Sequence, residues 1–299
     1  MEKEQDNSYH KINLNWYPGH MAKTKRQIIE DLKLIDVVVE LLDARMPISS
    51  RNPDIAEITK NKKRIIVLNK IDLSDETQNK KWVQYYKNNG IPTILVDSNS
   101  GKGIEQVSRE INKVMEEDLK VATQKGRIGK NIRVIILGIP NVGKSSFINR
   151  ISKKTSAIVG NKPGVTKQKQ WIRIANNIEL LDTPGVLWPK FENENVGLNL
   201  AYTGSIKDEV IEKTEIAYQL LRFLYKSYKE QLLVRYKITN FTEENDEEER
   251  ETILRLIDEI GKKRGTIISG GRIDYEKVSN IVLEDFRSGK LGKITLEQI

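Results

Sequence analysis

The chain has 299 residues, 38% of them hydrophobic, and a formal net charge of +8. This length suffices for one sizeable α/β domain together with a smaller one. The absence of cysteine excludes disulfides, thiolate metal sites and cysteine nucleophiles, and the two histidines, His10 and His20, argue against a histidine-rich metal site. No apolar run approaches the ~20 residues of a membrane span, and the polar N-terminus lacks the apolar core of a signal peptide. We therefore expect a cytoplasmic protein without a membrane partner.

The first third of the chain contains three apolar runs rich in Val and Ile, at 35–44, 64–72 and 91–101. They do not alternate apolar with polar residues, which is typical of strands buried on both faces of a parallel sheet. Helical spacing appears between and after them, at 76–87 and 104–119.

The polar, basic and glycine-containing segment 121–131 predicts a linker. Beyond it, 132–138 and 178–182 predict two further strands, with a helix-compatible run after the first. Alternating strands and helices indicate a doubly wound, mostly parallel sheet.

After the last strand the pattern becomes helical. Helical spacing occurs in 206–236 and again in 253–265 and 275–292, two segments that end in glycine. We therefore expect an α/β domain over 12–203 and a small all-helical domain over 204–299.

The positive charge is concentrated in one block. Residues 119–178 contain 13 Lys and Arg but no Asp or Glu, leaving 37 basic and 42 acidic residues elsewhere, a balance of −5. A solvated basic surface is one interpretation. Because a nucleotide accounts for only a few of these cations, the block favours a larger polyanion such as RNA nearby.

Residues 138–145, GIPNVGKS, match the phosphate-loop pattern G-x-x-x-x-G-K-[ST] between a strand and a helix. The glycines let backbone N–H groups converge on phosphate oxygens, and the helix N-terminus adds its positive end. We expect Lys144 to reach the β- and γ-phosphates and assist catalysis, and the Ser145 hydroxyl to ligate Mg²⁺. The remaining predicted nucleotide contacts of this loop are Asn141, Val142, Gly143 and Ser146.

Two further segments suit a Mg²⁺-nucleotide site. Asp182 begins the sequence DTPG at the end of a strand, 38 residues after Lys144, and would hold Mg²⁺ through water. The Gly185 N–H would meet the γ-phosphate. In the intervening segment 162–169, the Thr166 hydroxyl would complete the Mg²⁺ shell when GTP is bound, unless this segment is an ordinary surface turn.

The sequence NKID at the end of the second strand predicts a guanine-reading loop. The Asp72 carboxylate can accept both guanine donors, N1–H and the 2-amino group, whereas adenine presents an acceptor there. Asn69 would brace the loop and Lys70 would lie over the base. Ser98 and Asn99, after the third strand, would meet the guanine carbonyl.

In an ordinary GTPase the phosphate loop precedes the guanine-reading loop, and here the order is reversed. All the strands named above end at one edge of a parallel sheet, where ligands bind whatever the order of the strands along the chain. A permutation that preserves the sheet therefore preserves the site, and 121–131 would join the former termini. We interpret the chain as a circularly permuted P-loop GTPase domain followed by the helical domain.

The sequence resembles the ribosome biogenesis GTPase A family. The resemblance runs from Asn15 almost to the end of the chain, with NWYPGHM (15–21), DARMPISSRNP (43–53) and VLEDFRSGKLGKITLE (282–297) as its clearest segments. It implies a GTPase that binds the immature large ribosomal subunit, rRNA and ribosomal proteins, acts late in assembly and leaves after hydrolysis. One departure is Ser98-Asn99-Ser100, where many GTPases have S-A-K, which weakens those two guanine contacts.

The resemblance also suggests how hydrolysis proceeds. Val186 follows DTPG where many small GTPases carry a water-orienting glutamine, so another group must act. The resemblance implies His20, brought in by a Pro18-Gly19 hinge, although a lone histidine is more often structural; His10 is taken as a bystander. In similar GTPases an asparagine at the position of Asn141 coordinates K⁺, which would offset transition-state charge.

These inferences converge on a monomeric, GTP-hydrolysing switch with GTP or GDP, Mg²⁺ and K⁺ as ligands. One alternative is a GTP-gated RNA-binding scaffold with incidental hydrolysis. An ATP-dependent RNA remodeller is a third option, and NKID argues against it. The segments 261–265 and 269–272 offer cations and backbone to rRNA phosphates, or are solvated helix caps.

Overall fold

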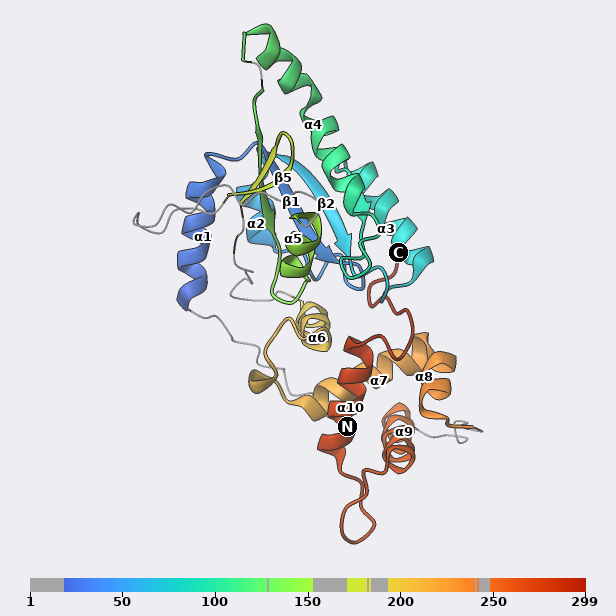
Figure 1. Cartoon of the computed structure of the whole chain (residues 1–299). Coiled ribbons are helices and arrows are strands. Elements are labelled where there is room, and N and C mark those ends of the chain that lie inside the picture. Colours follow the sequence, from blue (N-terminus) through green and yellow to red (C-terminus); the bar gives the residue numbers. More distant parts are fainter. Residues whose placement is uncertain are drawn as a thin grey trace, which may run out of the picture.

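The computed structural model describes residues 19–127, 129–152, 171–181, 183, 193–239, 241 and 248–299, with 19–22 described by their backbone only. Within these ranges, six strands form one sheet in the order β3-β2-β1-β4-β6-β5 (Figure 1). The strands are β1 Val37–Asp43, β2 Lys63–Asn69, β3 Thr93–Leu95, β4 Ile132–Leu137, β5 Trp171–Ala175 and β6 Ile178–Leu181. All are parallel to their neighbours except β5, which pairs antiparallel with β6 at the edge.

Helices cover both faces of the sheet because successive side chains of the central strands point to opposite sides. On one face, Val38 of β1 packs with Ile28 of α1. On the other, Val39 belongs to the same buried cluster as Ile111 of α4 and Phe147 of α5. The helices of this part are α1 Gly19–Leu32, α2 Pro53–Ile58, α3 Glu76–Asn88, α4 Ile104–Gln124 and α5 Lys144–Ser152.

The register of the central strands aligns the loops that follow them. Asp43, the last residue of β1, lies opposite Asn69, the last residue of β2. On the other side of β1, Glu40 lies opposite Leu137 at the end of β4. The guanine-reading loop and the phosphate loop therefore leave the same edge of the sheet, as the permuted order requires.

The C-terminal helices pack at the end of the sheet where these loops lie (Figure 1). They are α6 Glu194–Tyr202, α7 Lys213–Ser227, α8 Lys229–Tyr236, α9 Glu249–Arg264 and α10 Tyr275–Arg287, with a 3-10 turn at Asp208–Val210. Their buried apolar residues include Leu220, Leu221, Leu224, Leu256, Ile260, Val282 and Leu283. This cluster is continuous with the one on the α4 and α5 face of the sheet. None of the helices described here has the length and apolar character needed to cross a membrane.

The structure confirms the predicted α/β class and helical C-terminal part, and corrects some details. Helix α4 continues to Gln124, so the first four residues of the predicted linker 121–131 are helical. Helix α9 ends at Gly265 with φ +66°, the left-handed conformation expected of a glycine stop. Strand β5 and helices α1, α2 and α6 are additional to the predicted elements.

Candidate nucleotide site

The phosphate loop connects β4 to α5 and requires glycine at two positions. A Cβ on Gly138 would lie 2.8 Å from the backbone oxygen of Leu41 in β1. Gly143 has φ +93°, and a Cβ there would lie 2.4 Å from the Asn69 Nδ2 atom. The loop is therefore packed directly against the end of β1 and against the guanine-reading loop, and side chains are excluded at both contacts.

Asn69 joins three segments that are distant in the sequence. Its Nδ2 donates to the backbone oxygen of Val142 at 2.9 Å. Its Oδ1 accepts from the Ser98 hydroxyl at 2.7 Å and from the Ser98 N–H at 3.2 Å. Because Asn69 is fully buried, these bonds are shielded from water and fix the relative positions of the phosphate loop and the two loops predicted to read the base.

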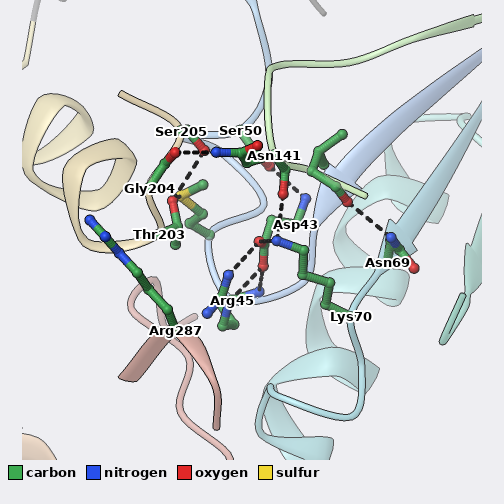
Figure 2. A network of polar contacts seen from close by, with 12 residues as sticks. Asp43, Arg45, Ser50, Asn69, Lys70, Asn141, Thr203, Gly204, Ser205 and Arg287 are labelled. Atoms are coloured by element: carbon green, nitrogen blue, oxygen red, sulfur yellow. Dashed lines mark hydrogen bonds and ion pairs between the residues drawn. The ribbon is translucent and has the colours of Figure 1, made fainter. Parts of the chain in front are cut away.

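Lys70 lies beside the phosphate loop and adopts a left-handed backbone conformation, with φ +63°. Its Nζ donates to the backbone oxygen of Asn141 at 2.6 Å and lies 3.0 Å from the carboxylate of Asp43 (Figure 2). Lys70 thus links the guanine-reading loop to the phosphate loop a second time, and Asp43 fixes its ammonium group.

Asp43 and Arg45 form a buried ion pair at the end of β1. The Arg45 Nε and Nη2 donate to the two carboxylate oxygens of Asp43 at 3.0 and 2.8 Å. Both side chains are at most 2% exposed. Burial by itself would raise the pKa of Asp43, but the Arg45 and Lys70 cations outweigh it and hold the pKa well below the usual range. The carboxylate is therefore ionised at neutral pH.

Asp72 differs from its neighbours because its side chain is exposed. Partial desolvation by the loop and the nearby Asp97 carboxylate raise its pKa above the ordinary value. Asn99 is also exposed, whereas Ser98 is buried against Asn69. The exposed Asp72 carboxylate matches the requirement for accepting two hydrogen bonds from a base.

Lys144 and Ser145 lie in the first turn of α5. The Lys144 Nζ donates to the backbone oxygen of Thr183, whose hydroxyl donates to the Ile136 oxygen at 2.6 Å. Ser145 and Ser146 are exposed. Among the described residues, no group of three His, Asp or Glu side chains could hold a metal ion. The exposed hydroxyl of Ser145 is an oxygen ligand that fits Mg²⁺ held mainly by phosphates and water.

The phosphate loop also contacts the C-terminal helices. The Asn141 Nδ2 donates to the backbone oxygen of Gly204, directly after α6 (Figure 2). Arg287 of α10 donates to the backbone oxygens of Ala201 and Tyr202 at the end of α6, at 2.9 and 3.0 Å. A chain of contacts therefore runs from the phosphate loop through the end of α6 to α10.

Several predicted site residues lie outside the described part of the chain. These are Thr166 with its segment 162–169, Asp182, Gly185 and Val186. The backbone of His20 belongs to α1, and its side chain is outside the description.

Part of the basic block identified in the sequence is neutralised by acidic residues from elsewhere. Lys130 pairs with Asp36 at 3.0 Å, and Arg133 lies 3.9 Å from Glu179. Arg150 of α5 donates to the backbone oxygen of Ser98 at 3.2 Å. The sequence count therefore overstates the positive charge that this block presents to a polyanion.

Sequence reasoning missed the supporting roles of three residues. In the sequence, Asp43 and Arg45 stand out only as part of the family segment 43–53, although a charged residue at the end of a mostly apolar strand indicates a position at the ligand-binding edge. The supporting role of Arg287 could not be recognised from the local sequence, because its partners lie 79 or more residues away.

Comparisons with known proteins identify the family of this chain. A family model described as "50S ribosome-binding GTPase" matches residues 133–266, starting just before the phosphate loop. Ribosome biogenesis GTPase A from Bacillus cereus is 47% identical over 95% of this chain and 93% of that protein. The crystal structure of GNP-bound YlqF from T. maritima has a TM-score of 0.65 and 27% identity, covering 92% of this chain and 98% of the other. A GDP-bound YlqF structure has a TM-score of 0.66 at the same identity, covering 91% and 99%.

The matched residues, 133–266, do not include the guanine-reading loop at 69–72, which precedes the phosphate loop in this chain. The relative from Bacillus cereus, by contrast, aligns with nearly the entire chain, including this loop and the C-terminal helices. On this similarity, the chain belongs to the ribosome biogenesis GTPase A family and is a circularly permuted GTPase.

Proposed function

We propose that this protein is a GTP-hydrolysing switch that binds the immature 50S subunit, promotes a late assembly step and is released by hydrolysis. The main support for nucleotide binding is the hydrogen bond from Asn69 to the backbone oxygen of Val142, which joins the guanine-reading loop to the phosphate loop. The subunit assignment is supported by the family model described as a 50S ribosome-binding GTPase and by the names of the relatives.

In the proposed site the two loops hold opposite ends of one nucleotide. Asp72 accepts the guanine N1–H and 2-amino groups, with Ser98 and Asn99 on the carbonyl side. The backbone of the phosphate loop binds the phosphates, Lys144 neutralises the β- and γ-phosphates, and Ser145 ligates Mg²⁺. Three further groups would complete the part of the site around the γ-phosphate and Mg²⁺. They are Asp182, acting through water, the Thr166 hydroxyl and the Gly185 N–H. Mg²⁺ supplies charge stabilisation when bound.

For hydrolysis, we assign the orientation of the attacking water to His20, since Val186 cannot form the required hydrogen bond. Asn141 is exposed, and its amide oxygen would coordinate K⁺ beside the phosphates. Free protein would hydrolyse GTP slowly, because a water-orienting group supplied by the N-terminal region needs the subunit to fix its position.

We assign GTP binding to 12–203 and RNA contact to 204–299, in a cytoplasmic monomer. The described basic end of α9, Lys262 to Arg264, and the hairpin between α9 and α10 are the proposed rRNA-facing elements. In this hairpin Gly270 and Gly271 are exposed and carry no side chain that would keep a phosphate away from the backbone.

The GTPase rate measured with and without large ribosomal subunits tests this proposal. We expect the subunit to raise the rate of the wild type at least about tenfold, and His20→Ala to lose most of that stimulation while still binding GTP. The same assays in K⁺ and Na⁺ test the cation, because equal rates would remove K⁺ from the proposal. A rate that the subunit leaves unchanged would instead favour a GTP-gated RNA-binding scaffold with incidental hydrolysis.

A further inference from the structure

The end of the chain returns to the guanine-reading loop and bonds to the residues that directly follow Asp72. The N–H of Ile294 donates to the Leu73 oxygen at 3.0 Å, and the N–H of Asp75 donates to the Thr295 hydroxyl at 3.0 Å. Asp75 is the N-cap of α3. In Figure 1 the C-terminus lies beside α3. We refer to the final segment, Leu291–Ile299, as the strap.

The strap is held on its other side by Tyr228, the residue between α7 and α8. The Tyr228 hydroxyl donates to the Thr295 oxygen at 3.0 Å and accepts from the Thr295 N–H at 3.1 Å. One residue of the strap, Thr295, is thus bonded through its backbone to the C-terminal helices and through its side chain to the loop after Asp72.

Burial makes this arrangement rigid. Ile294 and Thr295 are at most 1% exposed. The Leu296 N–H donates to the Arg45 oxygen at 2.7 Å, and the indole N–H of Trp82 in α3 donates to the Glu297 oxygen at 2.9 Å. The strap therefore contacts the Arg45 loop, the guanine-reading loop and α3 at once, and cannot shift without disturbing all three.

We propose that the strap positions the guanine-reading loop and transmits nucleotide occupancy to the C-terminal helices, with Thr295 and Tyr228 as positioning residues. This inference rests on the proposed role of Asp72 as the guanine reader. The base is identical in GDP and GTP, so the strap responds equally to both. It is therefore distinct from a switch that senses the γ-phosphate. The strap distinguishes nucleotide-free protein from protein that has bound either GDP or GTP.

Coupling of this kind is reciprocal. If the strap holds the loop in its binding geometry, weakening the strap lowers the affinity for every guanine nucleotide by the same factor. Since each hydrogen bond involved is neutral, loss of the Tyr228 hydroxyl should lower affinity about 3- to 10-fold.

The test is Tyr228→Phe, which keeps the ring that packs 5.9 Å from Phe223 and removes only the hydroxyl. We expect the affinities for GDP and GTP to fall by equal factors, and KM for GTP to rise with kcat unchanged. Tyr275→Phe is the matched control, because its hydroxyl bonds to Asp258 on the surface of the helical part. If the role of Tyr228 is purely structural, Tyr228→Phe lowers the melting temperature, but the affinities for GDP and GTP, measured well below that temperature, stay unchanged.

A second variant, Thr295→Val, removes the acceptor of the Asp75 N–H at nearly constant volume and should lower both affinities in the same way. Unchanged affinities in both variants, or a loss confined to GTP, would overturn the inference. Wild-type protein must also prefer GDP to ADP. If it does not, the guanine assignment itself fails and this inference fails with it, whereas a clear preference combined with unaffected variants rejects the strap alone.

Discussion

Asp72 and Asn69, three residues apart, have opposite surroundings that suit different tasks. Asn69 is fully buried and bonded to Ser98 and to the phosphate loop, so it supports the site without being available to a ligand. Asp72 is exposed, and partial desolvation of its carboxyl group together with the Asp97 charge raises its pKa. The residue proposed to read the base is therefore the one in this pair whose side chain is accessible to a ligand.

We predict that guanine-nucleotide affinity decreases on mild acidification. Only the ionised Asp72 carboxylate accepts both guanine donors, so binding is at full strength above its pKa and weakens about tenfold for each pH unit below it. Because the pKa is raised, the loss begins above the pH of about 4 at which an ordinary aspartate protonates. Asp72→Asn, which keeps the titration of the nucleotide phosphates, is the control. Wild-type affinity that follows the same pH curve as this variant would contradict the prediction.

At the scale of secondary-structure elements, the loop after β1 joins the sheet to the C-terminal helices. Arg45 pairs with Asp43 on one side and lies 5.2 Å from the ring centroid of Phe286 in α10 on the other. Its backbone oxygen accepts from Leu296 of the strap. One buried arginine thus contacts three elements that meet only in the folded state.

Arg45→Met should destabilise the protein strongly, because it leaves the Asp43 carboxylate buried with Lys70 as its remaining cation. We expect the free energy of unfolding to fall by about 3–5 kcal/mol, measured by denaturant titration. The exposed pair Lys25–Asp54 provides a control, and Lys25→Met should cost at most about 1 kcal/mol. A double variant, Asp43→Asn with Arg45→Met, should recover part of the loss. An Arg45→Met cost as small as that of the control would show that the pair contributes little.

Some of the strands and helices could be predicted from the sequence and others could not. Strands β1, β2 and β4 were predictable because most of their residues are apolar and buried on both faces, with few charged residues between them. Strand β5 was not, because this edge strand is only half buried and its sequence, WIRIA, includes an arginine. The last turn of α4, residues 121–124, is exposed and carries no apolar periodicity that would distinguish it from a linker.

The candidate site divides in the same way. The residues proposed to bind nucleotide lie in short motifs with fixed spacing, so they could be predicted from the sequence. Two of the supporting residues, Thr295 and Arg287, could not be predicted, because each bonds to a partner far along the chain. Thr295 meets Asp75 across 220 residues, and Arg287 meets Tyr202 across 85. Such contacts follow from tertiary packing and leave no local pattern.

At the scale of the whole molecule, the phosphate loop and the guanine-reading loop contact different parts of the C-terminal region. The phosphate loop contacts the end of α6 through Asn141, and α6 is held by Arg287. The guanine-reading loop contacts the strap, which is held by Tyr228. Both routes lead into the same helical core, so the base and the phosphates each have a connection to the surface proposed to meet the ribosomal subunit.

The central claim is that the two loops, reversed in order along the chain, bind one nucleotide. Its most direct test is the affinity of wild type and Asp72→Asn for GDP and xanthosine diphosphate. Xanthine presents an acceptor where guanine carries its 2-amino donor, so it suits an asparagine amide. We predict that the wild type prefers GDP, and that Asp72→Asn loses GDP affinity about 100-fold or more and prefers the xanthosine nucleotide. An Asp72→Asn protein that still prefers GDP would contradict the claim.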